Sequence, residues 1–228
     1  MAGIKPRCRI KTKWTSKLAY AIGLITTDGN LSKDGRHMEL TSKDREQLKN
    51  LQKCLGIKVK VGYKISGYTS QRCNRIQFGD INFYKFLLSI GLMPAKTKIM
   101  GKIEIPDKYF FDFLRGHFDG DGTFYSYFDP RWRSSYMFYV VFLSASKNHI
   151  TWLRETIHSL SKVKGHINYH RGVYQLKYAK TESLIIIAKM YYNPNVICLR
   201  RKKSKVHKSL AQNLINYADV VKLETTLP

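Results

Sequence analysis

The hydrophobic residues follow a helical period in two separate stretches of the chain, and each stretch ends at an Asp-Gly pair. Residues 18–32 (LAYAIGLITTDGNLS) begin with an apolar helical segment that has small residues on one face, and residues 110–124 (FFDFLRGHFDGDGTF) have the same character. Glycine commonly follows the last residue of a helix because it tolerates positive φ. The pattern therefore predicts two helices with Asp28 and Asp121 in their last turns, where the helix dipole disfavours a carboxylate by up to about 1 kcal/mol.

These two helices belong to a repeat that spans most of the chain. Asp121 follows Asp28 by 121 − 28 = 93 residues, and at this offset Gly23 matches Gly116. Residues 37–61 and 140–167 both predict a strand, a Ser-Lys pair, a helix N-cap at Asp44 or Asn148, an amphipathic helix and a basic strand. Residues 92–98 and 199–205 share the pattern Leu-x-x-x-Lys-Thr/Ser-Lys. Three matched segments in the same order indicate a tandem duplication.

The duplication predicts a mixed α+β fold. Each unit has the order α-β-β-α-β-β-α, with strands that we expect to form antiparallel sheets. The join falls near residues 101–110, where Pro106 interrupts the pattern. We therefore expect an N-terminal unit over residues 1–104, which includes a basic tail, and a C-terminal unit over residues 105–228, which ends in a helix.

The predicted strands alternate between an apolar face and a face rich in basic and amide side chains. In residues 58–66, valines alternate with lysines at period two. Arg, Gln and Asn can read base edges through paired hydrogen bonds, and Lys neutralises phosphate. Because both units share this bias, the pattern favours DNA binding over a merely solvated face. The candidate DNA-binding residues are Lys58, Lys60, Lys64, Gln71, Arg75, Gln77, Lys164, His166, Asn168, His170, Gln175 and Lys177. The aromatic segment 123–142, in contrast, predicts core and a hairpin tip.

The charge of the chain indicates the same partner. Lys and Arg number 40 and Asp and Glu number 16, so the formal net charge is +24. A compact domain with this excess repels itself unless a polyanion binds it, which favours nucleic acid over a merely soluble basic protein.

The remaining composition argues against several other classes of protein. Four cysteines (Cys8, Cys54, Cys73 and Cys198) lie far apart without a Cys-x-x-Cys pair, which predicts free thiols in a reducing compartment and no zinc site. The basic N-terminus lacks a signal-peptide core, and no apolar run approaches 18 residues. We expect a soluble, intracellular protein without membrane contact. The pattern does not distinguish a bacterial or archaeal cytoplasm from an organelle.

The two helices resemble the two copies of the motif that gives the LAGLIDADG homing endonucleases their name. The matching segments are AIGLITTDG (21–29) and LRGHFDGDG (114–122), in the single-chain form with two repeats. The resemblance implies a saddle with pseudo-twofold symmetry, in which the motif helices pack together and two four-stranded sheets lie along DNA. Gly23 and Gly116 would then allow the helices to approach closely. Thr26 replaces the first acid of the motif, which Asp119 keeps, and His117 replaces an apolar residue.

The resemblance also implies the site residues. Asp28 and Asp121 would be catalytic acids that bind Mg²⁺, for which Mn²⁺ or Ca²⁺ could substitute, and the carbonyls of Thr27 and Gly120 would be further ligands. Oxygen ligands suit Mg²⁺, which can stabilise the attacking and leaving oxygens. Lysines near the cleavage site would offset charge or orient water, unless they only contact phosphate. These are Lys43, Lys147, Lys96 and Lys203, and Ser42 and Ser146 occupy positions of water-orienting residues.

The function that follows is a monomeric, site-specific double-strand DNA endonuclease that promotes the mobility of an intron. Two alternatives stay open. One is a maturase that binds its own intron RNA, and the other is a DNA-binding regulator that does not cleave.

Overall fold

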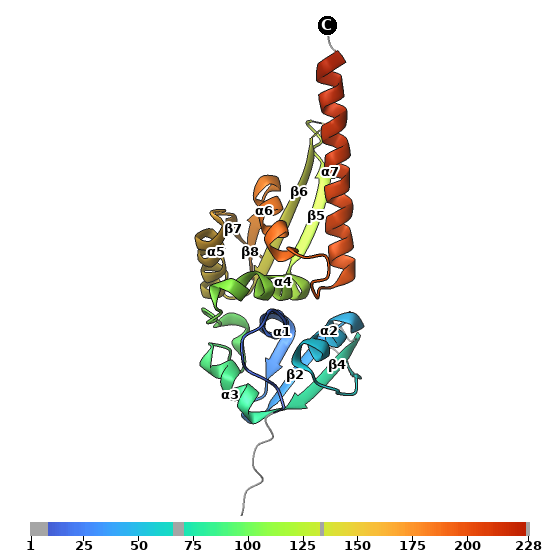
Figure 1. Cartoon of the computed structure of the whole chain (residues 1–228). Helices are drawn as coiled ribbons and strands as arrows, with labels where there is room; N and C mark the ends of the chain where they lie inside the picture. Colours follow the sequence, from blue (N-terminus) through green and yellow to red (C-terminus); the bar gives the residue numbers. More distant parts are fainter. Residues whose placement is uncertain (1–8, 66–70, 133–134, 227–228) are drawn as a thin grey trace, which may run out of the picture.

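Two four-stranded sheets lie on opposite sides of a central pair of helices in the computed structural model (Figure 1). The structure describes residues 9–65, 71–132 and 135–226, with side chains described as far as residue 214. Most of the expected N-terminal tail, residues 1–8, lies outside these ranges. None of the described helices is both long and apolar enough to span a membrane.

The first repeat has the predicted order of elements. They are α1 (Ser16–Asp28), β1 (Gly29–Leu31), β2 (His37–Ser42), α2 (Arg45–Leu55), β3 (Gly62–Ile65), β4 (Arg72–Gly79) and α3 (Ile81–Ser89), followed by the 3₁₀ turn η1 (Lys96–Lys98). All neighbouring strands pair antiparallel, in the order β1-β2-β4-β3.

The second repeat reproduces this arrangement. After the 3₁₀ turn η2 (Asp107–Tyr109) come α4 (Phe110–Asp121), β5 (Thr123–Phe128), β6 (Tyr136–Ser144), α5 (Lys147–Ser161), β7 (His166–His170), β8 (Val173–Tyr178), α6 (Lys180–Met190) and the long α7 (Arg200–Thr226). The sheet has the equivalent antiparallel order β5-β6-β8-β7. The predicted α+β fold with two repeats is therefore confirmed.

The helices α1 and α4 meet without side chains at their crossing. A Cβ on Gly23 would overlap the carbonyl oxygen of Phe113, and a Cβ on Gly116 would overlap that of Tyr20 and lie 3.1 Å from the Cα of Gly23. Around this contact α1 is buried from Leu18 to Thr26, as expected of a helix that is apolar on all sides. Only glycine permits backbones to pack this closely.

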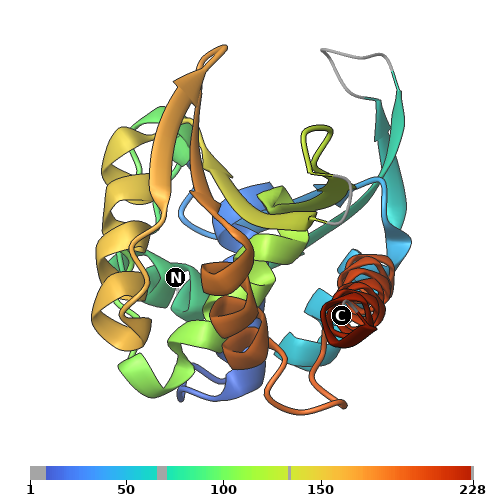
Figure 2. The same cartoon turned by 90° about the horizontal axis from the view of Figure 1, so that it is seen from above.

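Each sheet buries one face against its own helices. In the first sheet the buried positions include Met38, Leu40 and Ile76, of which Leu40 and Ile76 pair in register, and they join one core with Leu48 and Phe83 of the covering helices. In the second sheet, the buried positions include Phe124, Phe138, Val140, Phe142, Leu176 and Tyr178. The opposite faces stay open to solvent, because no described helix covers them in either view (Figures 1 and 2).

The start of α7 ties the two repeats together. Asp119 of α4 accepts hydrogen bonds from the Tyr20 hydroxyl and from the backbone N–H of Leu199, both at 2.7 Å. Arg201 pairs with Asp44 at 2.6 Å, and Arg200 pairs with Glu46, also at 2.6 Å, on α2 of the other repeat. Beyond this clasp α7 runs along β5 and continues past it, and Figure 2 shows the helix almost end-on.

Two local predictions were wrong. The strand expected from Lys58 begins only at Gly62, because the Gln52 side chain, rather than a strand, donates to the carbonyl of Val59. Lys58 and Lys60 therefore lie in the connection before β3. The N-cap of α5 is Ser146, whose Oγ accepts from the N–H of His149 at 3.4 Å, so Asn148 lies in the first turn and Lys147 begins the helix.

We predict that Gly23→Ala destabilises the protein by about 1–3 kcal/mol or more, because the new methyl group meets backbone atoms that cannot move aside. Urea unfolding would measure the change. Gly101→Ala is the matched control, since a Cβ there has nothing within 4 Å, and it should change the unfolding free energy by no more than about 0.5 kcal/mol. Equal unfolding midpoints for the two variants would contradict the close contact.

Candidate active site and nucleic-acid interface

Asp28 and Asp121 lie at neighbouring ends of α1 and α4. The helices cross with the same sense, since Tyr20 contacts Gly116 and Thr27 contacts Gly120 one or two turns further on. A Cβ on Gly120, the residue before Asp121, would lie 3.0 Å from Oδ2 of Asp28. Burial, followed by the negative charge of Asp121, raises the pKa of Asp28 to about 6. Burial also raises the pKa of Asp121. The structure thus brings the two predicted acids together.

Gln47 holds the carboxylate of Asp28. Its Nε2 donates to Oδ2 of Asp28 at 2.5 Å, and its own Oε1 accepts from the hydroxyl of Ser42 at 2.7 Å. The sequence analysis missed Gln47, although a buried amide beside Leu48 on an apolar helix face is unusual. Gln47 lies three residues after the N-cap Asp44, a position where Gln often serves in helix capping. This ordinary role made its contact with Asp28 hard to predict from the sequence.

Two lysines flank the acids, Lys96 buried and Lys202 half-buried. Lys96 donates to the carbonyl of Gly29, directly after Asp28. Lys202 donates to the carbonyls of Phe118, Asp119, Gly120 and Gly122 at 2.6, 2.9, 3.1 and 2.7 Å. Burial lowers the pKa of each lysine to about 8, although the acids oppose this shift. Because Gly29 and Gly122 are equivalent in the two repeats, Lys96 and Lys202 are equivalent lysines.

Lys202 therefore occupies the place that the repeat pattern assigned to Lys203. The side chain of Lys203 points away and donates to the carbonyl of Pro194 at 2.6 Å. The reason is local: the segment that contains Lys96 forms a 3₁₀ turn after Ala95 in the left-handed region, whereas its counterpart is an α-helix from Arg200. As a result, the lysine that reaches the equivalent carbonyl in the second repeat is one residue earlier than the repeat pattern indicates.

The other predicted site residues differ in their positions. Lys43 and Lys147 are exposed, at the end of β2 and the start of α5, and the described contacts do not connect them to the acids. The Thr27 hydroxyl donates back to its own helix at Gly23 and Leu24, at 3.3 and 3.1 Å. Ser146 donates to the carbonyl of Met100 at 2.5 Å, so it holds the linker between the repeats.

The donor set fits Mg²⁺ better than a metal that needs a full protein cage. Within the described ranges, no group of three or more His, Cys, Asp or Glu side chains could hold a metal ion, and three described cysteines are free thiols. Mg²⁺ commonly takes one or two carboxylates and completes its shell with water and phosphate oxygens. Two carboxylates whose charges raise their affinity for protons also favour a divalent cation between them. The Gly120 carbonyl would be available only if Lys202 released it.

The two acids are not held alike. Three residues after the N-cap, α5 carries His149 where α2 carries Gln47. His149 donates through Nδ1 to the Gly101 carbonyl at 2.9 Å, and its Nε2 lies 3.2 Å from Nε2 of His117. Burial lowers the pKa of both histidines, that of His149 to about 4. Asp121 receives no hydrogen bond from any described side chain, so the second repeat lacks the amide clamp.

The outward face of the first sheet carries Lys64, Arg75 and Gln77, as predicted. The register places Arg75 and Gln77 opposite Thr41 and Glu39 of β2. Gln71 is exposed directly before β4. Lys64, Arg75 and Gln77 gather around Glu39, an acid on this face that the sequence analysis did not identify.

The outward face of the second sheet combines polar residues with tyrosines. The predicted residues lie on it in register: His166 is opposite Lys177, Asn168 is opposite Gln175, and His170 is at the end of β7, while Lys164 precedes that strand.

The aromatic segment is only partly core. Phe124 and Phe138 face inward, but Tyr125, Tyr127 and Tyr139 face outward and stack, with centroids 5.1 Å apart for Tyr125–Tyr139 and 6.2 Å for Tyr127–Tyr139. The Nζ of Lys177 lies 5.6 Å from two of these rings. Because aromatic residues occupy both faces of these strands, the sequence does not show which of them face inward and which face outward.

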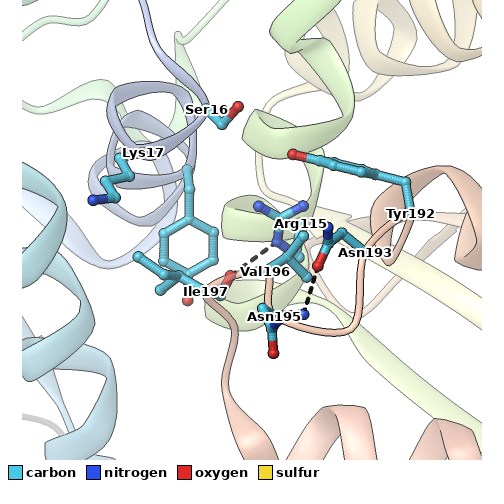
Figure 3. A pocket seen from close by; sticks show the side chains of 9 residues that line it. Ser16, Lys17, Arg115, Tyr192, Asn193, Asn195, Val196 and Ile197 are labelled. Atoms are coloured by element: carbon cyan, nitrogen blue, oxygen red, sulfur yellow. Dashed lines mark hydrogen bonds between the residues drawn. The ribbon is translucent and has the colours of Figure 1, made fainter.

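A cavity of about 280 Å³ lies at the opposite end of α1 from Asp28 (Figure 3). Ser16 and Lys17 line it, and the length of α1 separates them from Asp28 by roughly 18 Å. Arg115 in its wall donates to Asp112 at 2.6 Å and to the carbonyls of Met190 and Ile197 at 2.6 and 2.9 Å. This arginine therefore holds the loop before α7 and lies apart from the acids.

The chain is similar to known proteins in sequence and in fold. Residues 15–91 match the family model described as a LAGLIDADG-like domain. The structure of the I-LtrWI LAGLIDADG homing endonuclease bound to target DNA has a TM-score of 0.60 at 12% identity, over 93% of this chain and 98% of that one. The homing endonuclease I-WcaI bound to its DNA recognition sequence gives a TM-score of 0.57 at 15% identity, over 86% and 92%. Full-length DUF199/WhiA from Thermatoga maritima gives 0.55 at 13% identity, over 92% and 68%.

These likenesses show the fold: the chain has the LAGLIDADG architecture in its single-chain form with two repeats. No curated protein sequence matches the chain.

We predict that Asp28→Asn stabilises the metal-free protein above pH 6 and not below pH 4. The folded-state pKa of about 6 exceeds the ordinary value of 3.8, so ionising Asp28 opposes folding, and this cost grows as the pH rises from about 4 to about 6. The gain should reach at most about 3 kcal/mol, by the usual relation between pKa and free energy. Thermal unfolding across this pH range would measure the gain in stability. The control is Asp107→Asn, which removes an exposed acid. A stability difference that is independent of pH would contradict the prediction.

We also predict that Lys202→Met destabilises the protein by about 1–3 kcal/mol, because four carbonyls at the end of α4 lose their donor. The adjacent Lys203→Met, which loses one partly exposed hydrogen bond, should change stability by about 0.5 kcal/mol or less. Denaturant unfolding of the two variants would distinguish the lysines. A larger loss of stability in Lys203→Met than in Lys202→Met would restore the assignment of Lys203.

Proposed function

We propose that this chain, with its two-repeat LAGLIDADG fold and a LAGLIDADG-like domain in the first repeat, is a site-specific endonuclease that cuts both strands of duplex DNA with Mg²⁺. The observation that carries the proposal is the placement of Asp28 and Asp121 at adjacent helix ends, with the buried Lys96 beside one and the half-buried Lys202 beside the other. Two sheets extend away from this point. The outward face of the first carries Lys64 and Arg75, and that of the second carries Lys177 among polar residues and tyrosines. A duplex across both sheets would place one acid near each strand.

The residues of the chain have separate roles in this proposal. Asp28 and Asp121 would hold Mg²⁺, which when bound stabilises charge on the attacking water and on the leaving oxygen. Gln47 fixes the orientation of Asp28. Lys96 and Lys202, with pKa values of about 8, can donate a hydrogen bond or a proton to a phosphate oxygen near neutral pH. One phosphodiester of each strand would be hydrolysed across the minor groove, which leaves a short 3′ overhang.

Several observations support duplex DNA as the substrate. I-LtrWI and I-WcaI, which share the fold, are described as homing endonucleases bound to DNA. The three outward tyrosines stack on one another as one group, which suits groove contacts better than separate stacking of each ring with unpaired bases. Both acids come from one chain, which supports action as a monomer. An endonuclease of this kind would promote the mobility of the intron that encodes it.

A second function has specific support: DNA binding without cleavage. WhiA shares the fold and, unlike I-LtrWI and I-WcaI, is not described as an endonuclease. The retained acid pair favours the nuclease, because a protein that only binds DNA gains nothing from two carboxylates that oppose each other.

We predict that the protein cleaves a subset of a randomised plasmid library in the presence of Mg²⁺, and that Asp28→Asn and Asp121→Asn each slow cleavage at least about 100-fold, which is about 2.7 kcal/mol in the barrier. Sequencing of the cleaved ends would identify the target. Each variant should still bind that target, since neither acid is needed to contact the grooves.

Asp107→Asn, at an exposed acid before α4, is the control and should cut at the wild-type rate. Specific binding without any cleavage by the wild type would instead favour the regulator. Tighter binding of intron RNA than of DNA at one salt concentration would favour the maturase.

A further inference from the structure

Glu39 lies at the centre of a hydrogen-bonded network on the outward face of the first sheet. Its side chain is only 10% exposed, between Lys64 of β3 and Arg75 of β4. Oε1 accepts from Lys64 at 2.7 Å, and Oε2 accepts from Nε of Arg75 at 2.7 Å and forms an ion pair with its Nη2 at 2.5 Å. Burial alone would raise the pKa of Glu39, but the hydrogen bonds from Lys64 and Arg75 lower it overall. The acid is therefore ionised and fully engaged near neutral pH.

The network also fixes the orientation of a neighbouring amide. Nη2 of Arg75 donates to Oε1 of Gln77 at 2.7 Å. A guanidinium has no acceptor, so the amide oxygen of Gln77 must face it and the NH₂ group must face away. The groups that Lys64, Arg75 and Gln77 leave for a ligand are N–H groups, which are donors. The hydroxyl of Thr41, opposite Arg75, is itself turned toward Oε1 of Glu39, to which it donates at 3.3 Å.

This pattern has a defined complement in the major groove of DNA. Guanine offers two acceptors, O6 and N7, and thymine offers O4, whereas adenine sets an amino donor beside its single N7 acceptor and cytosine presents an amino donor. A Gln side chain reads adenine by using its oxygen and its nitrogen together, and in Gln77 the oxygen is turned toward Arg75, so the two atoms do not face one adenine.

We propose that Glu39 determines specificity: by fixing Arg75 and Gln77 as donors, it makes this part of the sheet select guanine or thymine on the contacted strand and reject adenine and cytosine. The inference rests on the proposed DNA binding by the sheets. It concerns the first sheet alone, because the second sheet presents stacked tyrosines beside Lys177 instead.

The test is a comparison of target profiles for wild type and Glu39→Gln, measured by selection of bound sequences from a randomised duplex library at one salt concentration. The wild type should prefer guanine or thymine at one or two adjacent positions of the first half-site. In Glu39→Gln the guanidinium and the Gln77 amide become free to reorient, so discrimination at those positions should fall about tenfold, the size expected of one good paired contact. The positions of the other half-site should keep their preferences.

Two further variants sharpen the comparison. Arg75→Lys keeps the charge but cannot hold Glu39 and Gln77 together, so it should broaden the same positions. Glu104→Gln removes an acid from an exposed pair with Lys102, away from the sheets, and should leave the profile unchanged.

The outcomes separate the inference from the proposed function. An unchanged profile in Glu39→Gln with binding intact, or a wild-type preference for adenine or cytosine at the positions that Arg75→Lys alters, would overturn the role of Glu39 alone. Absence of sequence-specific binding by the wild type to any duplex would overturn the proposed function and this inference with it.

Discussion

The backbone contact between Gly23 and Gly116 is the constraint on which the rest of the molecule depends. The backbone of each helix fills the space that a side chain on the other helix's glycine would need. This close contact brings the last turns of both helices to one point. The sheets follow directly after those turns, so their positions are set by the same contact. The geometry of the fold and that of the candidate site therefore have one origin.

That contact also concentrates charge where helices tolerate it poorly. Two carboxylates occupy negative helix ends, where burial raises the pKa of both and the charge of Asp121 adds to the rise at Asp28. Lys96 and Lys202 offset this by donating to the carbonyls at the same ends. A site that opposes folding in this way is characteristic of function, since structural needs alone would replace such groups with neutral ones. Asp119, two residues before Asp121 on the buried side of α4, shows the contrast: its carboxylate joins Tyr20 to Leu199 and serves the architecture.

The sequence predicted the parts that follow from periodicity and repetition. The two apolar helices, their glycines, the paired acids and the strands recur in the same order in both repeats, so they could be located without coordinates. Lys202 could not, because the repeat pattern aligns letters, whereas a 3₁₀ turn and an α-helix present those letters at different angles. Gln47 was hidden by a position typical of helix capping, and the outward tyrosines by aromatic residues on both faces of their strands. Glu39 escaped notice because its role depends on which strands are neighbours across the sheet.

The clasp at the start of α7 has a consequence for the order in which the site is assembled. Both acids belong to the central helices, and Lys96 lies in the first half of the chain, but Lys202 belongs to the final helix. During synthesis from the N-terminus, the carbonyls at the end of α4 are without this lysine until the start of α7 emerges from the ribosome. A nascent chain in that interval holds both carboxylates with only one of their two lysines, so the protein acquires its electrostatic balance as a late event of folding.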